Sequence, residues 1–364
     1  MNLARSPHII EISELGQEGS KIELFIDADI GGTDPTYTLS KLIPASNKIE
    51  TYYNISPYIK EYFNWNIYFL STGLVLDGTT SGYYPNFQVD YELKKYKLVS
   101  GVYTQVGATI TDSFVDGFGY TEEGFNPAAP TILLDEGTYF YNYDGSLLTS
   151  QNNGLWGSFE AQISVGDVMR YTDISTGASV DITATTAGIK TFARVYLNYA
   201  QNGNKVEYLA GGTTLRWTSI FKPLCEPKYQ PVVIDFINKY GSWSRIFFQK
   251  RKDRSISIKS NEYKSNPKDL PYNSYDAKQL QQFNINGSET IKLNTGWVND
   301  GYGEYLQQMM LSEYVTICDY ENNPNFAAVK VKSNSLEKQI GLNNGMINYT
   351  IEFEFAYDII NTII

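Results

Sequence analysis

Apolar and polar side chains alternate most regularly near the end of the 364-residue chain. From Ile347 to Phe355 every second residue is apolar, and the residues between them are Asn, Thr or Glu. Successive strand residues point to opposite faces of a sheet, so this period of two predicts a half-buried strand. The preceding Asn344-Gly345 pair favours a type I′ hairpin turn, and we expect the partner strand within residues 329–336.

One nearby segment has a helical period instead. Its apolar residues recur at intervals of three and four, which lines one side of a 3.6-residue turn: Tyr302, Tyr305, Leu306, Met309 and Met310. Asp300 is a candidate N-cap, because its carboxylate can accept a hydrogen bond from a free N–H of the first turn. The pattern predicts a single helix at about residues 300–312 that packs its apolar side on the sheet.

Short alternating segments separated by Gly, Pro and Asn continue upstream. Residues 9–26 predict a hairpin, and Asn202-Gly203 predicts another hairpin turn. Residues 116–130 and 222–231 are rich in Gly or Pro and mark expected domain boundaries. We therefore expect a mainly β protein with two or three sandwich- or barrel-like domains: an N-terminal β domain at 1–125, a middle β domain at 126–222, and a C-terminal β domain with one helix at 223–364.

A basic run lies between two predicted strands of the last domain. Its members are Lys250, Arg251, Lys252 and Arg254, interrupted by Asp253. The flanking segments, 243–249 and 255–258, alternate like strands, so the run is expected at the tip of a hairpin. One interpretation of such a tip is a solvent-exposed turn with no binding role. The tip also suits contact with phosphate or with an acidic neighbouring subunit, and the acidic remainder of the chain favours the protein partner.

Composition and charge narrow the function classes. Aromatic residues make up 15% of the chain, with 30 Tyr and 18 Phe, which favours β structure. The formal net charge of −11 disfavours static binding to nucleic acid, because phosphate contacts need Lys and Arg. The same sign suits a surface that DNA slides past, and solubility explains it equally well. No apolar run is long enough for a membrane helix, so we expect no membrane insertion.

The sequence gives little support for an enzyme. His8 is the single histidine, in what we expect to be a flexible terminal arm, which disfavours a nucleophile–histidine catalytic set. Cys225 and Cys318 are expected to be reduced, and with His8 they lack metal-ligand spacing. Asp27 begins a stretch similar to a calcium loop, but its twelfth position is Thr38 instead of Glu. We predict no catalytic residue, no metal and no cofactor, although 40 acidic residues leave a glycosidase pair open.

Aromatic clusters are the remaining candidate contacts. Tyr139, Tyr141, Tyr143 and Trp156 lie close together in the middle module. Protein interfaces are enriched in aromatic residues, so we interpret these four as subunit contacts. Aromatic rings also stack on sugars, which leaves a receptor- or glycan-binding module as the alternative function, with these four residues as the sugar platforms.

Four segments also carry a resemblance to a known family: CEPKY at 225–229, LNTGW at 293–297, LSEYV at 311–315 and NYTIEFEF at 348–355. They resemble segments of virion tail proteins from crAss-like and related Bacteroidota tailed phages. The resemblance covers roughly the last 140 residues well and the first 225 loosely. Its motifs are structural and contain no catalytic signature.

The resemblance implies a structural protein that is assembled in the host cytoplasm into the virion tail. It implies several copies in a tail ring, hub or baseplate around the DNA exit path, with DNA passing without specific binding. The expected partners are further copies of the chain and other tail proteins. Contacts between them are expected at the basic run, the N-terminal arm and the exposed tyrosines.

Overall fold

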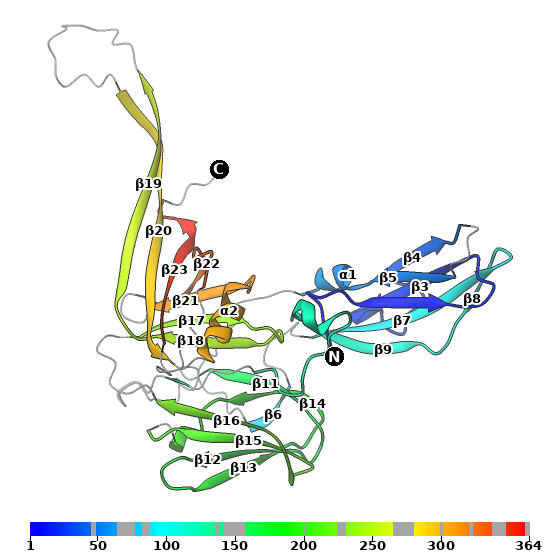
Figure 1. Ribbon diagram of the computed structural model, residues 1–364, viewed down its shortest axis with the longest axis horizontal. Helices are drawn as coiled ribbons and strands as arrows, with labels where there is room; N and C mark the ends of the chain where they lie inside the picture. The colour runs from blue at the N-terminus through cyan, green and yellow to red at the C-terminus, as the bar shows by residue number, and fades with distance from the viewer. Residues whose placement is uncertain are drawn as a thin grey trace. The chain divides into compact units, whose positions relative to one another are not determined.

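Figure 1 shows a computed structural model that describes residues 1–44, 49–63, 77–81, 88–134, 139–140, 157–199, 201–223, 231–264, 280–298, 301–319, 323–336 and 347–360. Over these residues the chain is mainly β, with two α-helices, α1 (Ser56–Lys60) and α2 (Tyr302–Met310), which confirms the predicted fold class. The chain divides into two compact units, Met1–Leu224 with Phe236–Arg245, and Cys225–Asp235 with Ile246–Ile364. The division into three domains stays a prediction.

The first unit begins with two sheets that share one core. The larger sheet has the order β1-β9-β7-β3-β4, with β8 paired to β7. Its strands are β1 (Asn2–Leu3), β3 (Gly19–Ile26), β4 (Tyr37–Leu42), β7 (Gln88–Val99), β8 (Val102–Gln105) and β9 (Ile110–Val115). The smaller sheet pairs β2 (Ile9–Ser13) with β5 (Glu50–Asn54). Short 3-10 turns follow β3 and β9, at η1 (Asp27–Asp29) and η2 (Thr121–Glu123).

The predicted hairpin over residues 9–26 is wrong. β2 pairs with β5, whereas β3 pairs with β4 and β7. The apolar residues of both strands, such as Ile12 and Leu24, lie in one buried cluster. Face-to-face packing of two sheets needs the same alternation as a hairpin with one buried face, so the local pattern does not distinguish the two arrangements.

Two further sheets of the first unit combine strands of the predicted middle module with β6, which comes from the predicted N-terminal domain. The five-stranded sheet has the order β10-β16-β15-β12-β13, and the three-stranded sheet has the order β11-β14-β6. The strands are β6 (Asp77–Ser81), β10 (Tyr139–Phe140), β11 (Ser158–Ile163), β12 (Val168–Asp173), β13 (Ser179–Thr183), β14 (Gly188–Ala193), β15 (Asn204–Ala210) and β16 (Thr214–Pro223). Asn202-Gly203 joins η4 (Leu197–Tyr199) to β15, so the predicted hairpin there is also wrong.

A seven-stranded sheet organises the second unit, in the order β18-β17-β21-β22-β23-β20-β19. Its strands are β17 (Val232–Ile237), β18 (Trp243–Phe248), β19 (Lys252–Lys264), β20 (Leu280–Val298), β21 (Val315–Asp319), β22 (Asn323–Val331) and β23 (Ile347–Asp358). The first unit includes residues 236–245, which are the end of β17, the turn after it and the start of β18. In this turn the Asn238 side-chain amide donates to the Leu133 carbonyl at 3.0 Å.

The predicted strand and helix of the second unit are both confirmed. β23 buries the five apolar residues of the alternation and leaves the residues between them half-buried or exposed. Its partner β22 pairs with it at Val329–Val331, the start of the predicted range. α2 buries Tyr302, Tyr305, Leu306 and Met309. The predicted turn at Asn344-Gly345 and the candidate cap Asp300 lie outside the described residues.

Candidate functional site

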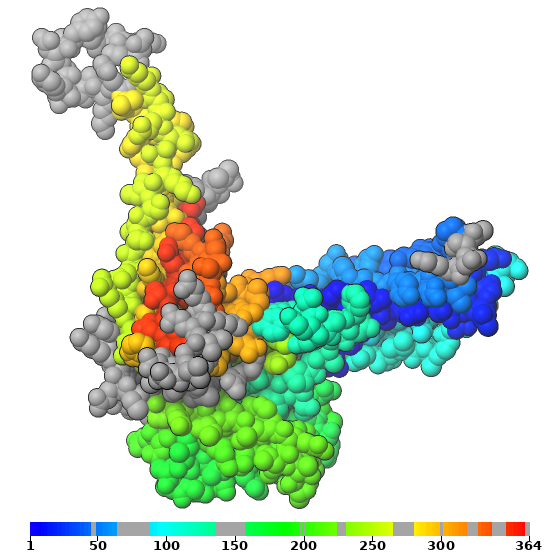
Figure 2. Space-filling view, viewed as in Figure 1, coloured from blue at the N-terminus to red at the C-terminus, as the bar shows by residue number. Residues whose placement is uncertain are grey.

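Strands β19 and β20 extend beyond the other strands of their sheet (Figure 1). They pair antiparallel from Lys252 opposite Leu293 to Lys264 opposite Leu280. β23 pairs with β20 as far as Ser288. Gly287 and Asn286 still hydrogen-bond to Ile359 and Ile360, and the rest of the ribbon, from residue 280, pairs with β19. We call residues 256–264 with 280–287 the arm. Figure 2 shows this two-stranded ribbon extending past the rest of its sheet.

Large apolar side chains of the arm are exposed to solvent. Six of them are between 44% and 71% exposed: Ile256, Ile258, Tyr263, Leu280, Phe283 and Ile285. Ile256 and Ile258 lie on the same face as the buried Ile291, because the pairing places them two and four residues further along that face. Beyond Ile291 this face carries the ion-paired Arg254 and Glu289, and then the exposed Ile256 and Ile258. A two-stranded ribbon is marginally stable in water by itself, so such an arm calls for a covering partner.

A polar pocket of about 430 Å³ lies on the opposite face of the sheet, at the root of the arm. It is lined by residues of β19, β20, β23 and the segment before β19: Lys250, Arg251, Asp253, Lys292, Asn294, Trp297, Asn348 and Thr350. Asp253 lies opposite Lys292, Asn294 lies opposite Thr350, and Trp297 lies opposite Asn348. We call this the Trp297 pocket.

An irregularity in β20 places Trp297 in the pocket. The register with β23 shifts between Asn294 and Trp297, so one extra residue separates them and both side chains point to the solvent face. Gly296 has a φ of +75°, which favours glycine. A Cβ at Gly296 would lie 2.9 Å from Lys250 Cε, so the glycine also lets the Lys250 side chain lie across the strand.

The charges of the pocket differ in sign from the charge of the chain. Three cationic side chains, of Lys250, Arg251 and Lys292, meet one carboxylate, of Asp253, whereas the whole chain carries −11. Arg251 Nε donates to Asp253 Oδ1 at 2.7 Å, and both side chains are exposed. The local excess of positive charge favours an anionic ligand or partner.

The structure separates the four predicted basic contacts. Lys250 and Arg251 line the pocket, whereas Lys252 and Arg254 lie within β19. Arg254 Nη1 is 2.9 Å from Glu289 Oε1. The predicted hairpin tip is wrong, because β18 and β19 lie at opposite ends of the strand order and residues 249–251 connect them. Long-range pairing of β19 with β20 overrides the local pattern on which the hairpin was predicted.

Of the four predicted aromatic contacts, Tyr139 alone lies within the described residues. Tyr139 lies in β10, paired in parallel with Lys222 of β16. Tyr141, Tyr143 and Trp156 lie outside the described residues. Sequence reasoning missed Trp297, Asn348 and Thr350 as site residues, although the polar positions of the 347–355 alternation pointed to one solvent-facing side.

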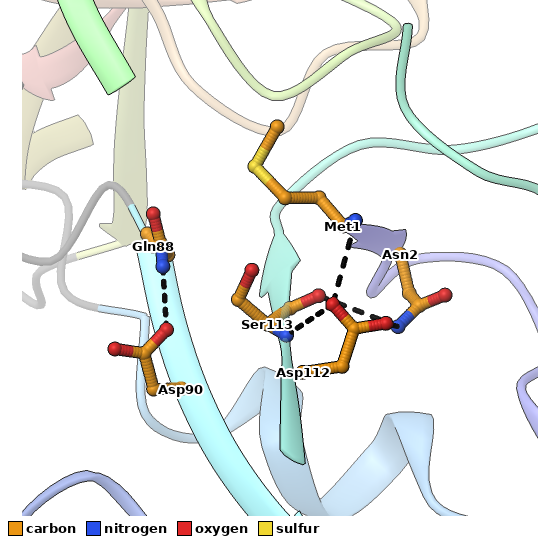
Figure 3. A network of polar contacts seen from close by, with 6 residues as sticks. All are labelled: Met1, Asn2, Gln88, Asp90, Asp112 and Ser113. Atoms are coloured by element: carbon orange, nitrogen blue, oxygen red, sulfur yellow. Dashed lines mark hydrogen bonds and ion pairs between the residues drawn. The ribbon is translucent and has the colours of Figure 1, made fainter. Parts of the chain in front are cut away.

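The N-terminal residues form part of the first unit, not the flexible arm that was predicted. β1 pairs in parallel with β9, and Asn2 Nδ2 donates to Asp112 Oδ2 at 3.0 Å (Figure 3). The Met1 ammonium is 3.5 Å from Asp112 Oδ1. The His8 ring lies edge-on to Phe114, with ring centroids 5.1 Å apart, and burial lowers the pKa of His8. The single histidine is thus held against the sheet.

A buried polar group also occurs in the first unit. Glu160 of β11 has no exposed surface, and the Ser242 hydroxyl donates to its Oε2. Arg194 Nε donates to the Ser158 carbonyl at 3.1 Å, and its positive charge acts on the Glu160 carboxyl. Burial, opposed by these two neighbours, raises the pKa of Glu160 to about 7. Glu160 therefore changes charge near neutral pH.

The described part of the chain offers neither a metal-ion cluster nor a membrane-spanning helix. Among those residues, no group of three or more His, Cys, Asp or Glu side chains is placed to hold a metal ion. Within the same ranges, no helix has the length and apolar character needed to cross a membrane. Cys318 is buried, and Cys225 lies outside the described residues.

Comparison with known proteins gives no family for the chain. No family model matches it, and no curated protein matches it. The resemblance to phage tail proteins therefore stays a prediction from the sequence.

Proposed function

We propose that this chain is a structural protein of a tailed-phage virion, one of several copies in a tail ring, hub or baseplate around the DNA exit path. The resemblance of the last 140 or so residues suggests the class of particle. The observation that carries an assembly role is the arm, whose apolar side chains lie exposed on a two-stranded ribbon.

A second copy of the chain is the partner that fits the arm. The exposed fractions of its six large apolar side chains correspond to on the order of 700 Å² of surface, against about 800 Å² per partner in a standard interface. Burying that area at about 25 cal/mol per Å² contributes on the order of 15 kcal/mol. Association itself costs about 4–15 kcal/mol, so one arm contact supports a weak to moderate pair.

Ring closure explains how weak contacts support a stable particle. An arm that packs on a different surface of the next copy makes a head-to-tail interface, and such interfaces close into rings when the rotation allows. Each copy in a closed ring is held at two interfaces, so its release requires both contacts to break. A passive role beside DNA agrees with the acidic balance of the chain.

Analytical ultracentrifugation of the purified chain, at about 1 to 100 µM, tests the proposal. We expect assemblies whose mass grows with concentration, in the range where weak pairwise contacts associate. The triple variant Ile258→Lys, Leu280→Lys, Phe283→Lys should stay monomeric, because each lysine would have to lose its hydration in the interface.

A matched triple variant controls for the added charge. Leu15, Leu42 and Phe125 are exposed residues of the first unit, and their replacement by lysine should leave assembly unchanged. A wild-type chain that stays monomeric throughout, or an arm variant that assembles as the wild type does, would refute the assembly role. Cross-linking in purified virions then tests the phage assignment itself, which requires that the chain be found in the tail.

A further inference from the structure

The hydrogen bonds of Asn294 leave the Trp297 pocket rich in donors. Asn294 Nδ2 donates to Asn348 Oδ1 at 2.5 Å and to Thr350 Oγ1 at 2.8 Å, and its Oδ1 accepts from the Gly296 N–H at 2.9 Å. Both Nδ2 hydrogens of Asn294 are thereby used. Its two partners keep their own hydrogens for a ligand, the amide N–H groups of Asn348 and the hydroxyl hydrogen of Thr350.

Lys292 keeps its charge available. The two acidic residues opposite it on neighbouring strands are Asp253 and Glu352. Asp253 is paired with Arg251 at 2.7 Å, and Glu352 is paired with Lys332 at 3.0 Å. Within the described residues Lys292 makes no ion pair. An anionic group in the pocket would give Lys292 an ion-pair partner, because Asp253 and Glu352 are already paired with other cations.

Trp297 adds an apolar platform beside these donors. Its side chain is 61% exposed. A buried tryptophan contributes one of the largest apolar areas of any side chain to a core or an interface, so an exposed one is available to a ligand. The shifted register and the glycine before it fix its place on the solvent face. A ligand of the pocket therefore needs a flat apolar face, several acceptor oxygens and a negative charge.

We propose that the Trp297 pocket binds an acidic saccharide, in which one pyranose ring stacks on Trp297 and its carboxylate lies between Lys292 and Arg251. The ring hydroxyls and any acyl carbonyl accept hydrogen bonds from Asn348 and Thr350. Arginine and lysine suit a carboxylate as charge-assisted donors, and the open pocket admits a chain of sugars. The binding site is independent of the assembly role proposed above.

Two other anionic ligands fit less well. Single-stranded nucleic acid is bound by successive aromatic platforms along a basic groove, whereas this pocket offers one aromatic ring in a chain of net charge −11. An acidic peptide of another copy would satisfy the cations without needing the ring of Trp297. Both become outcomes of the test.

Isothermal titration of the full chain with a tetramer of galacturonate tests the proposal, with a neutral galactose tetramer as the matched ligand. We expect binding of the acidic sugar in the range of about 0.1 to 1 mM, and at least tenfold weaker binding of the neutral one. Trp297→Ala and Lys292→Gln should each weaken binding about tenfold. Higher salt concentration should weaken the binding of the acidic tetramer and leave the binding of the neutral tetramer unchanged.

Matched variants separate the pocket from the general surface. Lys222→Gln removes an exposed cation of the first unit, and Tyr52→Ala removes an exposed aromatic side chain there, so both should bind as the wild type does. Equal binding of the neutral tetramer, or binding unaffected by Trp297→Ala, would overturn the proposal. So would a preference for oligothymidylate or for an acidic peptide, and so would the absence of binding at 10 mM galacturonate tetramer, about tenfold above the expected range.

Discussion

Replacing Glu160 by glutamine should change how the stability of the first unit depends on pH. Glu160 is fully buried, faces Thr191 across the β11–β14 pair, and accepts a hydrogen bond from Ser242. Arg194 is the charged neighbour that favours the carboxylate. Burial nevertheless outweighs it and raises the pKa from the ordinary value of 4.5 to about 7.

The direction of the effect follows from proton binding. Between pH 4.5 and about 7 the folded chain holds a proton on Glu160 that the unfolded chain has lost. The contribution of this group is therefore fully present below pH 4.5 and is lost as the pH rises through the folded pKa near 7. The loss is about 1.4 kcal/mol per pH unit, which amounts to about 3 kcal/mol over this range.

Glutamine imitates the protonated carboxyl and cannot lose a proton. Glu160→Gln should therefore match the wild type near pH 5 and gain about 3 kcal/mol relative to it at pH 8. Other titrating groups, such as His8, are shared by the two proteins and cancel in the comparison. Urea unfolding of the full chain, fitted with a separate transition for each unit, measures the difference.

The matched control is Glu11→Gln, which removes an exposed carboxylate from β2 of the same unit. Its unfolding free energy should follow that of the wild type at every pH. Parallel pH profiles of the wild type and Glu160→Gln between pH 5 and 8 would refute the assignment of a raised pKa to Glu160.

Two pairs of substitutions test the packing of the first unit. In urea unfolding, Gly241→Ala should destabilise the first unit more than Gly16→Ala. Both glycines have positive φ, but a Cβ at Gly241 would lie 2.8 Å from the Asp116 backbone nitrogen, whereas a Cβ at Gly16 would meet no atom within 4 Å. Equal effects would contradict this contact. Phe159→Ala should lower the free energy of unfolding by about 3–5 kcal/mol, because this side chain is buried. Phe125→Ala should lower it by less than about 0.5 kcal/mol, because that side chain is 75% exposed. Similar shifts in melting temperature for the two variants would refute the assigned core.

The elements that the sequence predicts well are those whose signal is local. The alternation from Ile347 to Phe355 depends only on which side of one strand is buried, and β23 buries the predicted side. The spacing between Tyr302 and Met310 predicts a helix at about residues 300–312, and α2 occupies Tyr302–Met310 within that range. Both patterns are satisfied whatever the neighbouring elements are, so they survive in the folded chain.

Strand pairing is less predictable because it depends on distant residues. β2 finds its partner some forty residues away in β5, and β19 pairs with β20 instead of the adjacent β18. For the same reason, the sequence predicts only some residues of the candidate site. Lys250 and Arg251 stand out by charge, whereas Trp297 joins them only through a register shift that no local pattern reveals.

The pairing between β19 and β20 also decides whether the two proposed surfaces compete. Between Lys252 and Lys259 the register has no shift, so strand alternation holds along this stretch. Ile256 is three residues from Asp253, and it therefore points to the face opposite the Trp297 pocket. Tyr263 and Phe283 lie on the pocket side of the ribbon, further along the arm. A copy that covers Ile256 and Ile258 on the core-side face leaves the pocket itself open to solvent. Sugar binding and assembly can then occur in one particle, and the loss of either one leaves the physical basis of the other intact.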